Sequence, residues 1–363
     1  MSNQANTKKI VLTGGGTAGH VTPNIALLPH LQNLGYEISY MGSYDGIEKR
    51  LIADFDIPYY GIATGKFRRY LDVKNFTDPF KVIKGYSEAK NYLKKIRPDV
   101  VFSKGGFVSV PVVRAAASLK IPCILHESDM TPGLANKLCV SAASKICCNF
   151  PETVTMLPKE KAVLTGSPIR EELASGNKIA GLDLCGFSAN KPVVMVVGGS
   201  LGAASVNEFV RKALPRLLED FQVVHLCGKG KVDETLLNQK GYKQFEYIKT
   251  ELKDIFAMAD VVVSRAGANA ICELLALGKP NILIPLPSAK SRGDQILNAR
   301  SFESQGFSIV IDESELSVDL LAEKVQELYC NRQSYIDTMK QSNQLNSIAT
   351  IMDLIAEIST NQY

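Results

Sequence analysis

The sequence predicts an α/β protein made of two doubly wound halves, each a parallel sheet covered by helices on both faces. Its apolar runs are short and continuous instead of alternating, which is typical of strands buried on both sides. Helical segments separate these runs, and a glycine-rich turn joins a strand to a helix in each half, at 14–20 and at 198–202. With about 100–200 residues per domain, the 363 residues accommodate two such domains.

The elements of the first half follow from these runs. Strands are expected at 8–12, 38–41, 100–103 and 123–126, and helices at about 23–34 and 109–119. Pro23 suits the start of the first helix, because the first turn of a helix does not use that N–H. The half therefore begins with a strand, a glycine turn and a helix.

The same order restarts in the second half. Strands are expected at 193–197, 223–227, 245–248, 261–264 and 281–284, and helices at about 203–218, 268–277 and 294–304. The polar stretch 175–191 is interpreted as an irregular hinge region. The domain boundary is placed between residues 169 and 170, which gives domains 1–169 and 170–344 and a helical tail at about 345–363.

Composition and charge exclude several classes of protein. The formal net charge is +4 and the pI about 8.5, which is too weakly basic to predict a nucleic-acid-binding protein. No secretory leader is expected, and no apolar run reaches the roughly 18 residues of a membrane span. The eight cysteines lack metal-site spacing and are expected to be reduced core residues, as in the cytosol.

The first glycine-rich turn reads Gly-Gly-Gly-Thr-Ala-Gly-His. Glycines let the backbone approach a ligand and a helix N-terminus attracts an anion, so Gly15 and Gly16 are candidate diphosphate contacts. No Gly-Lys-Ser/Thr follows, which excludes a P-loop, and no acidic residue is found near 39–43 to complete a dinucleotide fingerprint. A tight turn without a ligand is the alternative.

His20 closes this turn at the edge of the sheet where ligands of open α/β sheets bind. An imidazole there can remove a proton from a sugar hydroxyl at neutral pH, so His20 is the candidate base; a histidine that only bonds the loop is the alternative. Gly105 with Gly106, and His126 with Glu127, each follow another strand and are predicted to line the same crevice. For His126 and Glu127, a purely structural pair is an equal alternative.

The second half carries the groups expected to hold a nucleotide sugar. Ser200 in the second glycine turn offers a hydroxyl and an amide to a diphosphate, and Arg170 is either a phosphate partner or an exposed salt bridge. Glu273 lies about one and a half turns into an otherwise apolar helix, where a charge needs a partner, and is assigned to the two hydroxyls of a ribose. Asp294 and Gln295 suit the hydroxyls of a sugar, or Asp294 only caps a helix.

A basic and aromatic stretch occupies the region after residue 65. Residues 66–70 read Lys-Phe-Arg-Arg-Tyr, and the following helix carries Phe76, Phe80, Ile83 and Tyr86 among several lysines. This mixture suits an anionic membrane surface, and an ordinary amphipathic helix is the alternative.

Six blocks of the chain resemble, in order, those of the MurG family of N-acetylglucosaminyltransferases, in the form typical of Gram-positive bacteria. The blocks are 14–20, 103–109, 126–128, 198–202, 264–267 and 292–299. This is glycosyltransferase family 28, whose GT-B fold has two Rossmann-like domains separated by a cleft and a C-terminal helix that crosses back to the first domain. The resemblance implies an acceptor- and membrane-facing domain at 1–169 and a UDP-GlcNAc-binding domain at 170–344.

The resemblance also implies roles for individual residues. Donor-binding residues would be Thr17, Ala18, Gly19, Arg170, Ser200, Ile248, Ala268, Glu273, Asp294 and Gln295, with the backbone of Ile248 near the uracil. Acceptor or diphosphate contacts would be Gly15, Gly16, Gly105, Gly106, His126 and Glu127, and His20 would be the catalytic base. Two positions depart from the family pattern: Asp129, where some members have Asn, and Asp294, where others have Gln.

The implied reaction is an inverting transfer of GlcNAc from UDP-GlcNAc to the 4-hydroxyl of MurNAc in lipid I, undecaprenyl-diphosphate-MurNAc-pentapeptide. The product is lipid II, used in peptidoglycan synthesis. No cofactor is required, and the sequence indicates no metal. The protein is expected to be a peripheral protein at the anionic cytoplasmic face of the cell membrane. A cell-wall synthesis complex is a further candidate partner. The alternatives are a UDP-GlcNAc 2-epimerase, a diacylglycerol glycosyltransferase of the same fold, or a nucleotide-sugar-binding subunit without activity.

Overall fold

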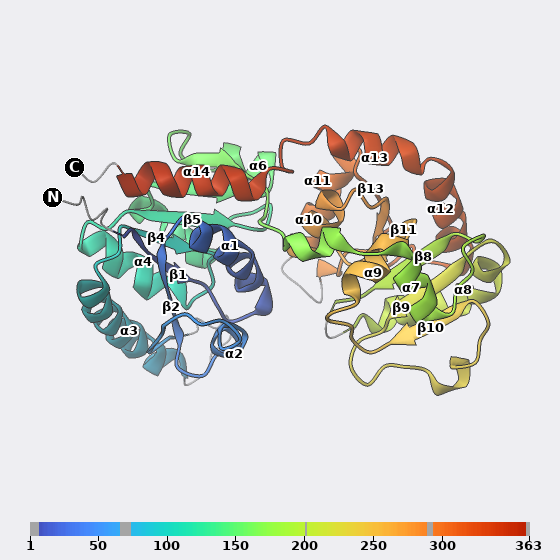
Figure 1. The fold of residues 1–363 in the computed structure, drawn as a ribbon, viewed down its shortest axis with the longest axis horizontal. Helices are drawn as coiled ribbons and strands as arrows, with labels where there is room; N and C mark the ends of the chain where they lie inside the picture. The colour runs from blue at the N-terminus through green and yellow to red at the C-terminus, as the bar shows by residue number, and fades with distance from the viewer. Residues whose placement is uncertain (1–6, 66–73, 200–201, 289–292, 361–363) are drawn as a thin grey trace. The chain divides into compact units, whose positions relative to one another are not determined.

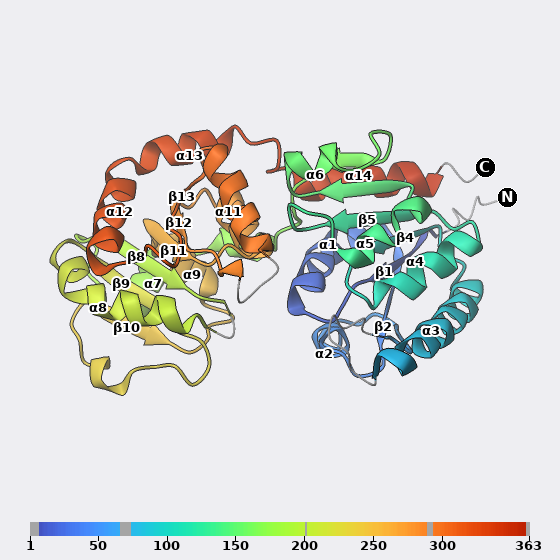
Figure 2. The ribbon, with the colours of Figure 1, turned by 180° about the vertical axis from the view of Figure 1, so that it is seen from behind.

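The computed structural model describes residues 7–65, 74–199, 202–288 and 293–360. The chain forms two compact units: unit 1 comprises residues 1–168 and 346–363, and unit 2 comprises residues 169–345. Each unit is a parallel sheet flanked by helices on both faces (Figures 1 and 2). The predicted fold class, two Rossmann-like doubly wound α/β domains, is confirmed.

Unit 1 has the strand order β3-β2-β1-β4-β5-β6-β7 within the described residues. Its strands are β1 Lys9–Thr13, β2 Glu37–Ser43, β3 Tyr59–Ile62, β4 Val100–Ser103, β5 Cys123–Glu127, β6 Lys145–Cys148 and β7 Ala162–Leu164. Its helices are α1 Thr22–Asn33, α2 Ile47–Ile52, α3 Lys74–Ile96, α4 Ser109–Ser118, α5 Leu134–Lys137, α6 Pro151–Thr155 and α14 Ser347–Thr360, with 3₁₀ turns η1 Ala18–His20 and η2 Val140–Ala142.

Alternate residues of β1 point to opposite faces of this sheet. Ile10 and Leu12 pack with α1 and α14, whereas Val11 packs with α3 and α4. All three side chains are fully buried. Because both faces are covered, β1 is a continuous apolar run, as a parallel strand inside a doubly wound sheet requires.

The last helix, α14, belongs to unit 1 although the residues before it belong to unit 2. Ile351 and Ile355 are fully buried in the cluster that contains the strands of unit 1. The hydroxyl of Ser347 donates to the carbonyl of Ser167 over 2.7 Å. The chain therefore leaves unit 1 next to the point where it returns to it. No helix in the described ranges is long and apolar enough to cross a membrane.

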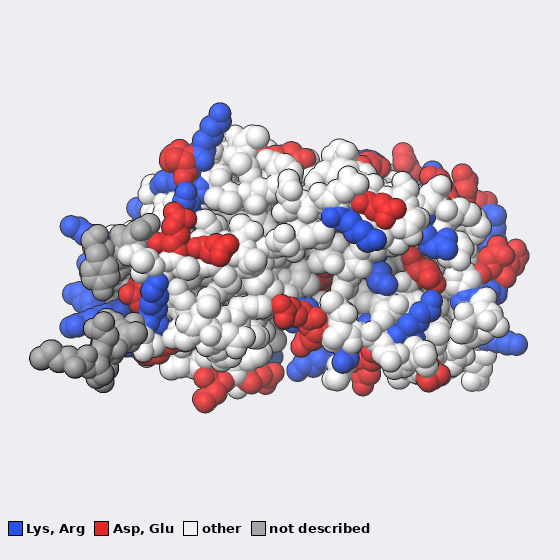
Figure 3. Space-filling view, turned by 45° about the horizontal axis from the view of Figure 1, so that its top comes forward, with Lys and Arg blue, Asp and Glu red and all other residues white. Residues whose placement is uncertain are grey.

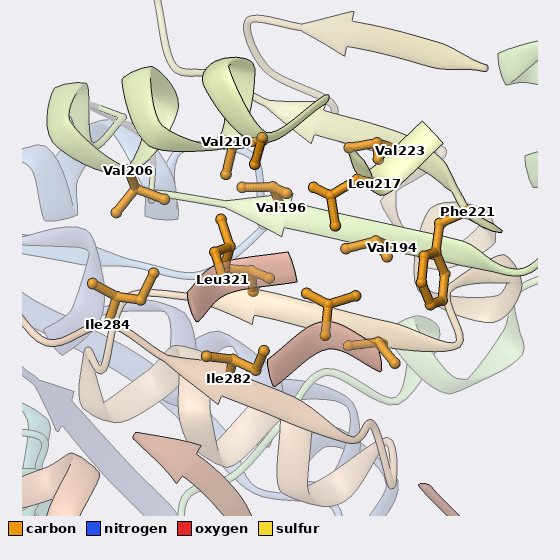
Figure 4. Packing of buried hydrophobic residues seen from close by; sticks show 14 of the residues in the cluster. Val194, Val196, Val206, Val210, Leu217, Phe221, Val223, Ile282, Ile284 and Leu321 are labelled. Carbon is orange, nitrogen blue, oxygen red and sulfur yellow. The ribbon is translucent and has the colours of Figure 1, made fainter. Parts of the chain in front are cut away.

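Unit 2 repeats this architecture with the strand order β10-β9-β8-β11-β12-β13 within the described residues. Its strands are β8 Val193–Val197, β9 Gln222–Leu226, β10 Tyr242–Phe245, β11 Val261–Ser264, β12 Asn281–Leu283 and β13 Ser308–Val310. Its helices are α7 Lys178–Cys185, α8 Ala204–Asp220, α9 Leu252–Met258, α10 Ala268–Ala276, α11 Asp294–Ser304, α12 Val318–Cys330 and α13 Arg332–Lys340, with 3₁₀ turns η3 Glu171–Ser175 and η4 Glu234–Leu236. Figure 4 shows Val194 and Val196 of β8 between Val210 of α8 and Leu321 of α12 in its core.

Two sequence-based expectations about unit 2 are wrong. The stretch 175–191 is not irregular, because it contains α7, whose N-cap Asn177 accepts hydrogen bonds from the amides of Ile179 and Ala180. The strand expected at 245–248 is β10, which ends at Phe245 instead. β10 lies at the edge of its sheet and alternates buried and half-buried residues, so it lacks a continuous apolar run.

The strand order reverses between β1 and β4 in unit 1 and between β8 and β11 in unit 2. Ligands of open α/β sheets bind outside the carboxyl ends of the strands at such switch points. The two glycine-rich turns follow β1 and β8, so each unit carries its turn at its own switch point.

Candidate functional site

Two glycine-rich loops meet at the switch point of unit 1. Residues 14–16 follow β1, and Gly105 and Gly106 follow β4. The Gly15 amide lies 3.4 Å from the Gly105 carbonyl oxygen, and Gly106 has φ +81°. A Cβ atom at position 106 would lie 2.3 Å from the Gly15 carbonyl oxygen, so a larger residue would force the loops apart. The two loops that the sequence assigned to one crevice are in direct contact.

The turn η1 follows the first of these loops and ends at His20. Thr17 and Ala18 are exposed, and Gly19 and His20 are half-buried. The backbone and side chains of this turn are therefore accessible to a ligand at the carboxyl edge of the sheet.

The ring of His20 is oriented by a carbonyl from the neighbouring strand. Its Nδ1 lies 3.2 Å from the carbonyl oxygen of Lys104. A carbonyl only accepts hydrogen bonds, so Nδ1 carries the proton in this contact and Nε2 carries the lone pair of the neutral ring. We assign this tautomer from the contact, and it is the one in which Nε2 can accept a proton.

A carboxylate that sequence reasoning missed supports the same loop. Glu48 of α2 is fully buried, and its Oε2 accepts from the Gly16 amide over 3.1 Å while its Oε1 accepts from the Ser43 amide over 3.0 Å. The stretch 39–43 contains no acidic residue, as the sequence indicated, because Glu48 lies beyond it in α2. Because Glu48 bonds the loop itself, it orders the turn, unlike the ribose-binding carboxylate of a dinucleotide fold.

His126 lies beneath the site and is held on both sides of its ring. It is fully buried, with Nε2 2.9 Å from the Gly166 carbonyl oxygen and Nδ1 2.8 Å from Lys104 Nζ. Burial, and secondly the charge of Lys104, holds the pKa of His126 well below its usual range, so the ring stays neutral. Lys104 is itself fully buried and also donates to the hydroxyl of Ser128. These contacts favour the structural alternative for His126.

Glu127 organises the loop after β5. Its Oε1 accepts from the amides of Ser128 and Asp129, over 2.9 and 3.1 Å. Its Oε2 accepts from the Gly133 amide over 2.9 Å and from Asn136 Nδ2 over 2.8 Å. Burial raises the pKa of Glu127, and the bonds from Asn136 and Gly133 oppose the rise. Both carboxylate oxygens accept hydrogen bonds from groups of the protein, so we interpret Glu127 as a residue that holds the conformation of this loop.

In unit 2 the second glycine turn joins β8 to α8. Gly199 and Gly202 have φ +82° and +67°, and the Gly202 amide donates to the Gly199 carbonyl over 2.8 Å. A Cβ atom at position 202 would lie 2.0 Å from the Cys227 carbonyl oxygen, so the turn packs directly on the end of β9. Ser200, the predicted phosphate contact, lies outside the described residues.

Glu273 lies in α10, which begins at Ala268 after the N-cap Gly267. Burial raises the pKa of Glu273 to about 7, and the positive charge of Arg170 opposes this rise. Arg170 pairs with Glu172 over 2.8 Å, within unit 2. A carboxylate whose pKa is raised by burial, beside a cationic group near a switch point, has the properties of a ligand-binding residue.

The other predicted donor contacts lie on nearby loops of unit 2. Ile248 is buried in the segment after β10. Gly293, with φ +83°, is the N-cap of α11, so Asp294 is the first helical residue and not the cap. Gln295 Oε1 accepts from the Leu286 amide over 3.1 Å, which fixes the side chain and leaves its NH₂ group to donate elsewhere.

Arg265, directly after β11, is a second residue that sequence reasoning did not assign to the site. Its Nη1 donates to the carbonyls of Ile284 and Pro285 over 3.0 and 3.1 Å. Its Nη2 pairs with Glu313 over 2.5 Å and donates to the hydroxyl of Ser205, in the first turn of α8, over 3.0 Å. This guanidinium joins the loops after β12 and β13 to the first turn of α8 at the switch point of unit 2. No group of three or more His, Cys, Asp or Glu in the described part of the chain could hold a metal ion.

Two family models match the chain. The N-terminal domain of glycosyltransferase family 28 matches residues 10–148, and the C-terminal domain of the same family matches residues 193–355. The chain belongs to glycosyltransferase family 28. It is therefore a glycosyltransferase, and each matched domain contains one of the two glycine-rich turns.

Similar proteins cover nearly the whole chain. The UDP-N-acetylglucosamine--N-acetylmuramyl-(pentapeptide) pyrophosphoryl-undecaprenol N-acetylglucosamine transferase of Lachnoclostridium phytofermentans is 66% identical over 97% of this chain and 99% of its own length. The proteins of the same name from Lachnospira eligens and Clostridium tetani are 63% and 56% identical, each over 97% of this chain and 99% of their own lengths. The resemblance to the MurG family is confirmed.

Solved structures support the fold. The crystal structure of Acinetobacter baumannii MurG superposes with a TM-score of 0.78 at 28% identity, covering 96% of this chain and 99% of that one. The crystal structure of a "putative UDP-N-acetylglucosamine 2-epimerase" from Listeria monocytogenes superposes with a TM-score of 0.69, covering 98% of this chain and 97% of that one. At 12% identity this second likeness concerns the fold alone.

Proposed function

We propose that the chain transfers GlcNAc from UDP-GlcNAc to the 4-hydroxyl of MurNAc in lipid I, with inversion at the anomeric carbon, and so produces lipid II. The observation that carries this proposal is the 66% identity, over 97% of the chain, to a transferase named for that donor and that acceptor. The match covers nearly the whole chain and therefore both domains.

Unit 1 supplies the base in this proposal. His20 removes the proton of the attacking hydroxyl through Nε2, since its Nδ1–H is bonded to the Lys104 carbonyl. Removing this proton as the new bond forms makes the hydroxyl oxygen a stronger nucleophile. The exposed loop at Gly16 leaves room for the diphosphate of the acceptor, since no atom lies within 4 Å of a Cβ placed there.

Unit 2 holds the donor in this proposal. Glu273 accepts both hydroxyls of the ribose, the backbone of Ile248 contacts the uracil, and Asp294 and the NH₂ group of Gln295 bind the sugar. Amides of the second glycine turn, together with Arg170, stabilise the charge that grows on the departing UDP. The leaving group is a diphosphate, so preorganised donors aimed at its oxygens lower the barrier more than contacts to the sugar do.

We further propose that unit 1 binds the anionic cytoplasmic face of the membrane through α3, as a peripheral protein. Phe80 and Ile83 of α3 are 74% and 66% exposed, and Lys81 and Lys84 beside them are also exposed. Acidic and basic side chains are interspersed on the face seen in Figure 3, in keeping with the small net charge. Attraction to the membrane therefore depends on this local mixture of apolar and basic residues.

The test is transfer of labelled GlcNAc from UDP-GlcNAc to lipid I, compared with transfer to diacylglycerol. We expect a labelled lipid II product and no glycosylated diacylglycerol. Incubation with UDP-GlcNAc alone distinguishes a transferase from an epimerase, because only an epimerase forms UDP-ManNAc without an acceptor. Tight binding of UDP with no transfer to lipid I would indicate a nucleotide-sugar-binding subunit without activity.

A further inference from the structure

A buried polar relay lies beneath the second glycine turn, next to the polar side chains of Arg211 and Gln244. His225 of β9 is fully buried, with Nδ1 2.8 Å from the Tyr242 hydroxyl and Nε2 3.0 Å from Asn207 Oδ1. Asn207, in the first turn of α8, donates from Nδ2 to the Cys227 carbonyl over 2.8 Å. The relay therefore joins β10, β9 and α8 to the residue that follows β9.

The direction of every hydrogen bond in the relay is determined. A carbonyl only accepts, so the amide of Asn207 donates to Cys227 and its Oδ1 must accept from His225. His225 therefore carries its proton on Nε2, and its Nδ1 accepts from the Tyr242 hydroxyl. Burial, and secondly the charge of Arg211, lowers the pKa of His225 to about 3, so the ring holds this neutral form at physiological pH.

The end of the relay is in contact with the glycine turn. The Cys227 carbonyl oxygen, which Asn207 fixes, is the atom that a Cβ at Gly202 would approach to 2.0 Å. The amide of Gly202 closes the turn on Gly199, and its carbonyl accepts from Lys231 Nζ over 3.1 Å. A shift of the Cys227 carbonyl would therefore displace the residues that shape the turn.

Unit 1 contains an equivalent device beneath its own glycine turn. Tyr40 pairs with Leu12, two residues before Gly14, just as His225 pairs with Val196, two residues before Gly198. Asn24 of α1 donates to the Tyr40 hydroxyl over 3.2 Å, and Tyr40 donates to the Gly14 carbonyl over 2.7 Å. In each unit a polar side chain of the neighbouring strand bonds an asparagine of the following helix; in unit 1 this pair bonds the turn itself at Gly14, and in unit 2 it bonds the Cys227 carbonyl, on which Gly202 packs.

We propose that His225 and Asn207 are positioning residues for the donor diphosphate, because they fix the Cys227 carbonyl against which Gly202, the last residue of the second glycine turn, packs. This inference rests on the proposed function, which supplies the donor. Glycine has the largest conformational freedom of any residue, so a glycine turn that is not held must be ordered when the ligand binds. A relay that holds Gly202 in advance lowers this cost in the binding of the diphosphate.

The test compares the dissociation constants of UDP and of uridine, which shares the base and ribose but has no diphosphate. We expect His225→Leu to weaken UDP binding about tenfold, which corresponds to ~1.4 kcal/mol, and to leave uridine binding unchanged. His225→Gln keeps one donor and one acceptor, so we expect it to restore most of the UDP affinity. A merely structural role would lower stability without separating the two ligands.

Two further variants keep the test decisive. Tyr242→Phe removes a single hydroxyl and decides the question if His225→Leu does not fold; we expect weaker UDP binding and unchanged uridine binding. Val325→Ala, in the core of unit 2 but on α12, is the control that lowers stability without touching the relay, and its UDP affinity should equal that of the wild type.

The inference is overturned if the folded relay variants bind UDP as the wild type does, or if they lose UDP and uridine affinity equally. Wild-type protein that binds neither UDP nor UDP-GlcNAc would overturn the proposed function, and this inference with it. Wild-type protein that binds UDP, with variants that do so unchanged, would overturn the inference alone.

Discussion

Glu273 is a half-buried carboxylate whose ionisation is opposed by this burial and favoured by the charge of Arg170, and the balance sets its pKa at about 7. Ribose hydroxyls donate to an ionised carboxylate more strongly than to a protonated one. The affinity for UDP-GlcNAc should therefore fall as pH decreases through 7. If only the ionised form binds, the loss between about pH 8 and pH 6 is about tenfold.

The measurement is a titration with UDP-GlcNAc across this pH range. Its diphosphate is esterified at both ends and does not titrate near pH 7, so the change belongs to the protein. Glu273→Gln should bind more weakly at pH 8 and show a flat profile. Arg170→Met should move the midpoint of the profile upward, because it removes the charge that favours the ionised form. Parallel profiles for the wild type and Glu273→Gln would exclude the ribose role of Glu273.

The His20 base is tested by a variant that keeps the bond to the Lys104 carbonyl. Gln at position 20 can donate to this carbonyl but cannot accept a proton at neutral pH. We expect His20→Gln and His20→Ala to lower kcat by about 10²–10⁴, the usual contribution of a general base. The dissociation constant of UDP should be unchanged in both. Turnover near the wild-type level in either folded variant would reject His20 as the base.

The central strands of both sheets were predictable because they are buried on both faces. β4, β8 and β11 match the expected strands, and each is a run of apolar residues apart from the serine that ends β4 and β11. The strands β3, β6, β7 and β13 were not predicted. β6 lies between β5 and β7, whereas the other three are edge strands of three or four residues. An edge strand buries less surface and can be short, so its sequence differs little from that of a loop.

The candidate site was predictable only where its residues follow a strand in sequence. His20 and Glu273 lie on turns and helices that directly follow β1 and β11, so the strand pattern located them. Glu48 reaches Gly16 from a helix 32 residues later, and Arg265 contacts two loops and the first turn of α8. Such contacts depend on which strands are neighbours, which the sequence pattern does not give.

Gly106 should tolerate no side chain, because of both its backbone conformation and its neighbour. Its φ is +81°, and a Cβ atom would lie 2.3 Å from the Gly15 carbonyl oxygen. Gly106→Ala should therefore destabilise unit 1 by about 1–3 kcal/mol and lower turnover on lipid I.

Gly35→Ala is the matched control, since Gly35 has φ +74° and no atom within 4 Å of the added Cβ. It should lose about 1 kcal/mol of stability and keep its kcat. Equal effects of the two substitutions on kcat would mean that contact between the two loops is not needed for turnover.

The membrane role of α3 is tested by removing its exposed apolar side chains without changing its charge. The double variant Phe80→Ser, Ile83→Ser keeps the neighbouring lysines. The side chains of Phe80 and Ile83 are largely exposed, so the fold should be retained. Burying either side chain in a bilayer is worth about 1.5–3 kcal/mol, so the double variant should bind phosphatidylglycerol vesicles at least about tenfold more weakly.

Leu34→Ser, at an exposed position of unit 1 after α1, is the control and should bind vesicles as the wild type does. The double variant should transfer GlcNAc at the wild-type rate to a lipid I analogue with a short, water-dispersed chain, because this acceptor is in solution and not in a membrane. Unchanged vesicle binding by the double variant would make α3 an ordinary amphipathic helix, and an equal loss in Leu34→Ser would show that the effect is not specific to α3.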